Sequence, residues 1–195
     1  MQNFYMKEGA LSYCSHAQAI VPNVNRLVDA VRRFGCPVVW LRNVTTTKST
    51  KSWSRHYDRM TQARIDIRKR ELAKDGEGFK FWHEMDVRET DRKVEKTRYS
   101  AFIPGASNLE NILGEYSADT LIVCGVATDV CVESTARDAM MMNYRTIIVE
   151  DACAANTIKA HEVSLNSLYL YFGDVQTTNQ IINVMGVDKA ADAAE

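Results

Sequence analysis

Two hydrophobic patterns alternate along most of this chain, and this alternation limits its fold more than any other feature. Between residues 17 and 35, apolar side chains recur every three or four positions, which is the spacing of a helix with one buried face. Residues 36–42 follow as a short β-branched and aromatic run, which is typical of a buried strand. A helix joined directly to a strand predicts an α/β fold, here a three-layer α/β/α sandwich around a mainly parallel sheet with Rossmann-like topology.

The second half of the chain repeats the alternation. It predicts strands at residues 93–96, 120–124, 145–149 and 174–176, and helices at residues 107–116, 128–143, 158–172 and 177–185. No internal repeat or linker divides the sequence, so residues 1–195 are expected to form one domain, and a chain of this length buries roughly 70% of its unfolded surface. The Ala-rich and acidic residues 188–195 are expected to fray.

Residues 43–80 interrupt this pattern. Residues 44–54 are rich in Thr and Ser and are predicted to form a loop, and residues 60–74 are predicted to form a highly charged helix. Residues 48–98 carry 15 Lys and Arg against 10 Asp and Glu. The segment is therefore either a solvated excursion from the sheet or a lid whose positive field attracts an anionic or carbonyl-rich substrate.

Charge and cysteine content argue against several classes of protein. The formal net charge is −1, which does not suit a nucleic-acid-binding protein with a broad basic face. The longest apolar run, residues 121–127, is far shorter than the roughly 20 residues that span a bilayer, so no membrane association is expected. Five cysteines without a Cys-x-x-Cys pair favour free thiols in a reducing compartment, and we expect a cytoplasmic protein.

Three reactive side chains stand at the ends of predicted strands, where binding sites form in parallel sheets. Cys131 falls in the first turn of the helix after residues 120–124, and the positive end of a helix stabilises a thiolate. Lys96 ends the strand at 93–96, and its charge favours a nearby thiolate or carboxylate. Asn43, directly after residues 36–42, can hydrogen-bond an amide-like substrate. Each has a plainer interpretation: a small packing residue, a solvated charge and a loop cap.

Taken in order, the sequence motifs resemble those of the isochorismatase-like cysteine hydrolase superfamily, from Met1 to about Met185. The most specific stretch is Gly-Val-Ala-Thr-Asp-Val-Cys-Val-Glu-Ser-Thr-Ala-Arg-Asp-Ala at residues 125–139, followed by Asp-Ala-Cys-Ala-Ala at 151–155. Residues 96–102, Lys-Thr-Arg-Tyr-Ser-Ala-Phe, match the lysine motif of the superfamily. The opening Met-Gln-Asn looks like the end of its Asp-x-Gln-Asn motif.

The resemblance implies a Cys-Lys-Asp triad with Cys131 as nucleophile and Lys96 as its positively charged partner. The Asp, the general base, is expected directly before Met1, at the end of an apolar central strand, and is absent from this sequence. A cis peptide is implied between Val126 and Ala127, with an oxyanion hole formed by the N–H groups of Ala127 and Cys131.

Three further residues are implied to bind substrate: Asn43, Gln2 and Tyr99. The likeness is greatest to ureidoacrylate amidohydrolases and related N-carbamoyl hydrolases, although the residues after Asn43 depart from their pattern. The implied reaction is hydrolysis of a C–N bond in a small amide, ureido or carbamoyl compound through a thioester. It needs no cofactor, and no metal is expected because the four His do not form the zinc set of nicotinamidases.

Two other functions remain open at this point. Without its base, the chain could be a non-catalytic binding or assembly protein, or it could hydrolyse the vinyl ether of isochorismate, chemistry that does not require a thiol. The superfamily also implies a homodimer or homotetramer, for which Met140, Met141 and Met142 offer a candidate interface, although Met on a helix is more often core.

Overall fold

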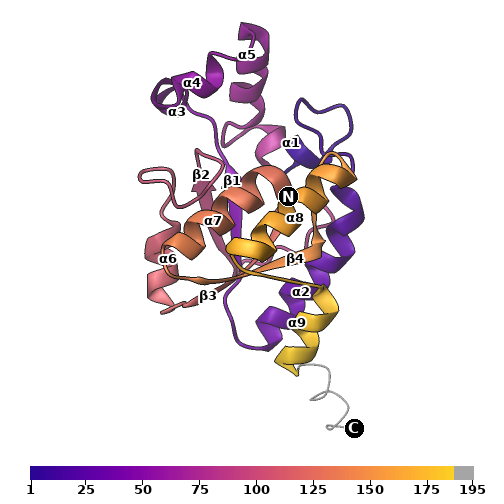
Figure 1. Cartoon of the computed structure of the whole chain (residues 1–195). Helices are drawn as coiled ribbons and strands as arrows, with labels where there is room; N and C mark the ends of the chain where they lie inside the picture. The colour runs from indigo at the N-terminus through magenta and orange to yellow at the C-terminus, as the bar shows by residue number, and fades with distance from the viewer. Residues whose placement is uncertain (187–195) are drawn as a thin grey trace.

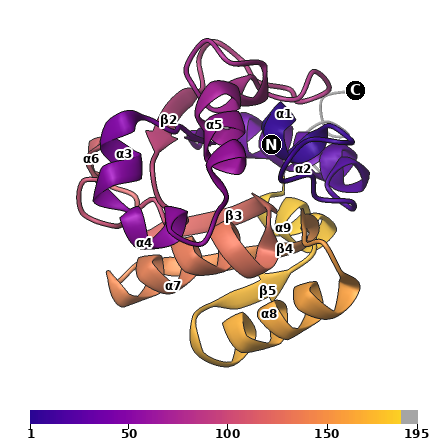
Figure 2. The ribbon, with the colours of Figure 1, turned by 90° about the horizontal axis from the view of Figure 1, so that it is seen from above.

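The computed structural model describes residues 1–186, in which parallel strands are enclosed by helices (Figures 1 and 2). β1 (Val39–Asn43) pairs with β2 (Arg92–Lys96), and β4 (Arg145–Ala154) lies between β3 (Thr120–Val126) and β5 (Asp174–Gln176). All three pairings are parallel, which confirms the predicted α/β class. Residues 188–195, expected to fray, lie outside the described part of the chain.

Helices cover both faces of the strands. α2 (Val21–Arg33) and α9 (Thr178–Met185) pack on one face, and α6 (Leu109–Glu115), α7 (Glu133–Met141) and α8 (Ile158–Tyr171) pack on the other (Figure 1). The short described helices and turns are α1 (Asn3–Met6), η1 (Gln18–Ile20), α3 (Thr47–Ser52), α4 (Ser54–Tyr57), α5 (Gln62–Glu71), η2 (Glu77–Phe79) and η3 (Thr128–Val132).

Successive residues of the strands enter different apolar clusters. On β4, Ile148 packs against α7 and α8, whereas its neighbour Val149 packs in the cluster that contains α2, and both are fully buried. Because both faces are covered, the strands read as continuous apolar runs in the sequence rather than as alternating ones. Trp40 of β1 belongs to the same cluster as Val149, so one apolar core joins the two sheets.

Among residues 1–186, no strand pairs with both β1 and β3. In the described chain, the sheet therefore consists of a two-stranded part and a three-stranded part. The apolar central strand that the resemblance places ahead of Met1 stays a prediction.

The segment between β1 and β2 differs from its prediction in one respect. The predicted loop at residues 44–54 is wrong, because α3 occupies much of it. Thr46 Oγ1 accepts a hydrogen bond from the Ser49 N–H at 3.0 Å, and Ser49 Oγ accepts one from the Thr46 N–H at 2.9 Å. The Ser and Thr content that indicated a loop thus provides a helix cap. The charged helix predicted at 60–74 is confirmed as α5, and α3, α4 and α5 lie together beyond the carboxyl end of β1 (Figure 1).

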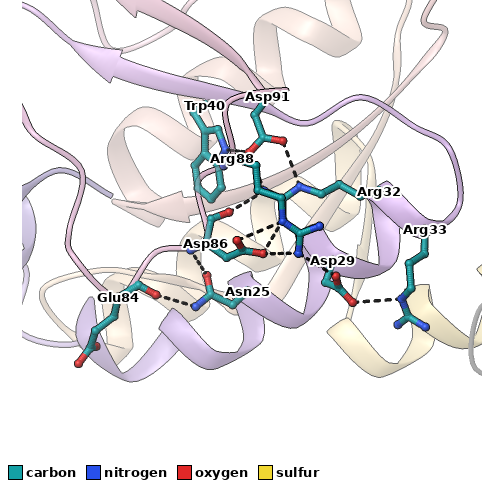
Figure 3. A network of polar contacts seen from close by, with 9 residues as sticks. All are labelled: Asn25, Asp29, Arg32, Arg33, Trp40, Glu84, Asp86, Arg88 and Asp91. Atoms are coloured by element: carbon teal, nitrogen blue, oxygen red, sulfur yellow. Dashed lines mark hydrogen bonds and ion pairs between the residues drawn. The ribbon is translucent and has the colours of Figure 1, made fainter.

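A buried ion-pair network fastens α2 to the start of β2 (Figure 3). Arg32 donates two hydrogen bonds to the Asp91 carboxylate, at 2.6 and 3.0 Å, and one to Asp86 at 2.6 Å. Trp40 Nε1 donates to the same Asp91 carboxylate at 2.7 Å. Burial by itself raises the pKa of Asp91, but the hydrogen bonds from Arg32, Trp40 and the Arg88 N–H outweigh it and hold the pKa below the usual value of 3.8.

Replacing this carboxylate is expected to destabilise the fold. Asp91→Asn removes the more deeply buried of the two carboxylates that pair with Arg32 and leaves it only the more exposed Asp86, so the free energy of unfolding at pH 7 should fall by about 3 kcal/mol. Because the folded pKa of Asp91 lies below the usual 3.8, its contribution is present above that pH and is lost as the pH falls through the folded value. Urea denaturation at pH 7 and at lower pH should therefore show the two proteins converging in acid.

The matched control is Asp58→Asn. Asp58 pairs with Arg55 at 3.2 Å, but the two side chains are 55% and 94% exposed. This change should alter the free energy of unfolding by less than about 0.5 kcal/mol. Equal losses from the two substitutions would contradict a stabilising role for the Asp91 network.

Candidate active site

A tight turn carries Cys131 to the carboxyl end of the sheet. β3 shifts register against β4 between Val123 and Gly125, and Gly125 has a φ of +115°, which disfavours any side chain there. The Val126–Ala127 peptide that follows is cis, as the resemblance implies. The predicted helix at 128–143 begins as the π-helical turn η3 and continues as α7, and the partly exposed Cys131 lies within η3.

The side chain of Lys96 is buried against this turn. Lys96 is 3% exposed, and its Nζ lies 3.4 Å from Cys131 Sγ and 3.1 Å from Asn43 Oδ1. The same ammonium group donates to the carbonyl oxygens of Arg98 and Tyr99, at 2.9 and 2.7 Å. The structure therefore brings Cys131, Lys96 and Asn43 together, and the alternative that Lys96 is a solvated charge is wrong.

Burial and the sulfur atom act on Lys96 in opposite directions. Burial lowers the pKa of Lys96, and its interaction with Cys131 counteracts that shift. The Lys96 ammonium group, 3.4 Å from Cys131 Sγ, is placed to stabilise negative charge on the sulfur atom. This arrangement is suited to nucleophilic attack by Cys131.

Asn43 is positioned by its strand and by Gln2. Asn43 is the register partner of Lys96 in the β1–β2 ladder, so both side chains stand where their strands end. Gln2 is fully buried and bonds both backbone groups of Asn43, with Nε2 to the Asn43 oxygen at 3.0 Å and the Asn43 N–H to Oε1 at 2.7 Å. Its Nε2 also donates to the Phe79 oxygen at 3.1 Å. These contacts show Gln2 holding Asn43 in place, and its binding of substrate stays a prediction.

Tyr99 joins an aromatic cluster formed with α4. The Tyr99 ring packs edge-on against Trp53 at 4.9 Å between centroids, and Trp53 stacks on His56 at 4.0 Å. Tyr99 Oη and His56 Nδ1 lie 3.4 Å apart. Trp53 and His56 were not predicted to lie near the site, because Trp53 falls in the segment predicted to be a loop. The spacing of Trp53, His56 and Tyr57 is nevertheless helical and could have indicated the cluster.

Side chains of helix α8 make hydrogen bonds with η3. Thr128 Oγ1 and His161 Nδ1 lie 2.9 Å apart, and Ser164 Oγ donates to the Thr128 oxygen at 3.4 Å. Ser164 also bonds Glu133, which accepts from Arg137 Nε at 2.8 Å. The turn that carries Cys131 is thus tied to a neighbouring helix through side chains on both elements.

The other cysteines stand apart from this arrangement. As predicted, all five cysteines are free thiols. Cys14 and Cys153 are buried and Cys36 is exposed, while burial raises the pKa of Cys124 to about 11. Within residues 1–186, no cluster of three His, Cys, Asp or Glu is arranged to hold a metal ion, and none of the helices has the length and apolar character needed to cross a membrane.

Several known proteins are similar to this chain in sequence or in fold. The chain is 31% identical to the ureidoacrylate amidohydrolase RutB of Variovorax paradoxus, over 93% of this chain and 77% of that protein. It is 29% identical to an N-carbamoylsarcosine amidase of Arthrobacter sp., over 95% of this chain and 68% of that protein. The crystal structure of a cysteine hydrolase from Pseudomonas syringae superposes with a TM-score of 0.80 at 24% identity, covering 95% of this chain and 88% of that one.

The match to a family model extends over most of the sequence. Residues 1–180 match the model of the isochorismatase domain. This range contains the Lys96 and Cys131 motifs and all five strands of the described chain. The chain therefore belongs to the isochorismatase family of hydrolases.

Proposed function

We propose that this hydrolase cleaves the C–N bond of a small amide, ureido or carbamoyl compound through a thioester on Cys131. The observation that carries the proposal is the buried Lys96 ammonium group 3.4 Å from Cys131 Sγ. The names of two relatives, a ureidoacrylate amidohydrolase and an N-carbamoylsarcosine amidase, support a C–N bond as the target.

In the proposed reaction, the Cys131 thiolate attacks the substrate carbonyl carbon while the Lys96 ammonium group stabilises the negative sulfur. The N–H groups of Ala127 and Cys131 then donate to the oxyanion of the tetrahedral intermediate. The C–N bond breaks, ammonia or an amine leaves with a proton, and an acyl-thioester remains. Water cleaves the thioester, which releases the acid and restores the thiol. The Asp predicted ahead of Met1 would accept the thiol proton and pass it to the leaving group.

Asn43 and Tyr99 are the proposed substrate contacts nearest to the reacting atoms. Asn43 Oδ1 accepts from Lys96 at 3.1 Å, so its Nδ2 group is the part proposed to donate to a substrate carbonyl. Tyr99 is proposed to form one wall of the substrate site, together with Trp53 and His56 of the aromatic cluster. Both residues adjoin Lys96 directly, Asn43 through its side chain and Tyr99 through its carbonyl oxygen.

Self-association of the chain stays a prediction. Met141 and Met142, at the end of α7, are 65% and 38% exposed, whereas Met140 is half-buried. Because these two side chains are exposed, we propose that they lie in the interface of a homodimer or homotetramer rather than in the core.

Removing the nucleophile is expected to abolish activity. Cys131→Ala should lower the rate of ammonia release from a panel of ureido and carbamoyl compounds by about 10³-fold or more, because no covalent intermediate can form. Its melting temperature should change little, since Cys131 is partly exposed. Cys36→Ser, at an exposed cysteine, is the control and should keep full activity. Full activity in Cys131→Ala would show that the assignment is wrong.

Thiol labelling separates a catalytic from a non-catalytic protein. In a Cys36→Ser background, iodoacetamide at pH 7 should modify Cys131 well before Cys14, Cys124 and Cys153, whose pKa values are raised by burial. Peptide mass mapping would follow each site. Equal, slow labelling of the four cysteines would favour the binding or assembly protein instead.

The same assay tests the partner of Cys131. Lys96→Gln should slow the labelling of Cys131 by about 10-fold or more, because the thiolate loses a cation 3.4 Å away. Lys93→Gln, which removes an exposed lysine from the same strand, should leave the rate unchanged. Circular dichroism would confirm that both variants fold.

A further inference from the structure

The π-helical turn η3 releases the Cys131 N–H group from the partner that an α-helix would give it. In a regular α-helix, the Ala127 carbonyl oxygen accepts a hydrogen bond from the N–H group four residues on, which here belongs to Cys131. In this turn it accepts from Val130 and Val132 instead, each at 3.1 Å. Turns of this wider kind are frequent at functional sites. The width of η3 thus makes the Cys131 N–H group available for another acceptor.

The Thr128 carbonyl oxygen is the point at which a neighbouring helix contacts the backbone of this turn. It accepts from the N–H group of Glu133, five residues on, and this spacing is what makes the turn π-helical. It also accepts from Ser164 Oγ of α8 at 3.4 Å. Thr128 is fully buried and Ser164 is 3% exposed, so water does not compete for the bond. A hydroxyl group of α8 therefore contacts the atom that closes the wide turn.

The Glu133 carboxylate fixes this hydroxyl group against the turn. Its Oε2 atom is in hydrogen-bond contact with Ser164 Oγ, and its Oε1 atom accepts from Arg137 Nε at 2.8 Å. The Arg137 guanidinium in turn lies 4.1 Å from the centre of the Phe172 ring. A carboxylate is a stronger hydrogen-bond acceptor than a neutral group. The backbone and the side chain of Glu133 thus both act on the contact between η3 and α8.

We infer that Ser164 is a positioning residue for the oxyanion hole: together with Glu133, it holds η3 in its wide form and keeps the Cys131 N–H group available to the tetrahedral intermediate. Ser164 acts through the backbone of the turn and not on the reacting atoms. The sulfur atom has a separate partner in Lys96, which comes from β2. This inference rests on the proposed function, because it concerns the covalent step at the same site.

Two reagents separate the oxyanion hole from the sulfur atom. With p-nitrophenyl acetate, the thiolate attacks the ester carbonyl carbon, an oxyanion forms, and the C–O bond breaks to release p-nitrophenolate and leave an acetyl thioester. With iodoacetamide, the thiolate displaces iodide from a saturated carbon, and no oxyanion forms at that carbon. Both rates are measured in the Cys36→Ser protein, and the protein that also carries Cys131→Ala serves as the blank.

Loss of the hydroxyl group should affect the two reactions differently. Ser164→Ala should lower the rate of acylation by about 10-fold or more, because a displaced donor stabilises the oxyanion poorly. The rate of alkylation should change by less than about 2-fold, since the Lys96 ammonium group still lies beside the sulfur atom. Ser167→Ala is the matched control, because it removes a hydroxyl group of the same helix that bonds Arg137 at 2.8 Å, and it should leave both rates unchanged.

A second variant approaches the same contact from α7. Glu133→Ala, at a side chain that is 21% exposed, removes the partner of Ser164 and should also lower acylation relative to alkylation. Circular dichroism would show that each variant folds, and should Ser164→Ala fail to do so, Glu133→Ala decides the question. An unchanged ratio of acylation to alkylation in the folded variants would overturn the inference. Failure of the Cys36→Ser protein to release p-nitrophenolate faster than the blank would overturn it as well.

The ester reports acyl transfer to Cys131 whatever the natural substrate is, so the two proposals can fail separately. A selective loss of acylation in Ser164→Ala, without ammonia release from any compound of the amide, ureido and carbamoyl panel, would support the role of Ser164 and contradict the C–N hydrolase. Ammonia release by the unsubstituted protein, with an unchanged ratio in Ser164→Ala, would support the hydrolase and remove the role of Ser164.

Discussion

The site depends on the hydrogen bonds made by the buried ammonium group of Lys96. It joins the end of β1 through Asn43, the chain at Arg98 and Tyr99 through two carbonyl oxygens, and η3 through Cys131. A buried charge is tolerated only when its hydrogen bonds are made, so these three segments must be in place together. The geometry around the sulfur atom is thus tied to the folding of the sheet.

The parallel sheet explains why segments distant in sequence meet at this point. The Asn43–Lys96 register pair sets two side chains side by side at the end of the β1–β2 ladder, and β3 delivers η3 to the same end. Gln2 adds two hydrogen bonds to the backbone of Asn43, as a neighbouring strand would. The His161 side chain of α8 forms a hydrogen bond with the Thr128 hydroxyl group of η3. Asn43, Lys96 and Cys131 therefore lie on strands and a helical turn rather than on loops.

Lys96 and Arg68 are two buried cations in different surroundings. Lys96 lies at a strand end, where carbonyl oxygens and a sulfur atom compensate its charge. Arg68 lies on α5 against the Phe4 ring, and its Nε is buried without a hydrogen-bond partner. The relatives described above carry different substrate names, and one fold can host different substrates when the residues of its site differ.

The sequence by itself determined the α/β class, because the helical and strand spacings of apolar residues are visible locally. It also located Cys131, Lys96 and Asn43, because each lies at the end of a predicted strand or in the turn that follows one. It did not reveal α3, whose cap has the composition of a loop. It also did not single out Arg68, which shares a charged helix with Arg64, Lys69 and Arg70. Only tertiary structure decided which of these cations is buried, because burial depends on Phe4 and Tyr57, which other segments of the chain bring against α5.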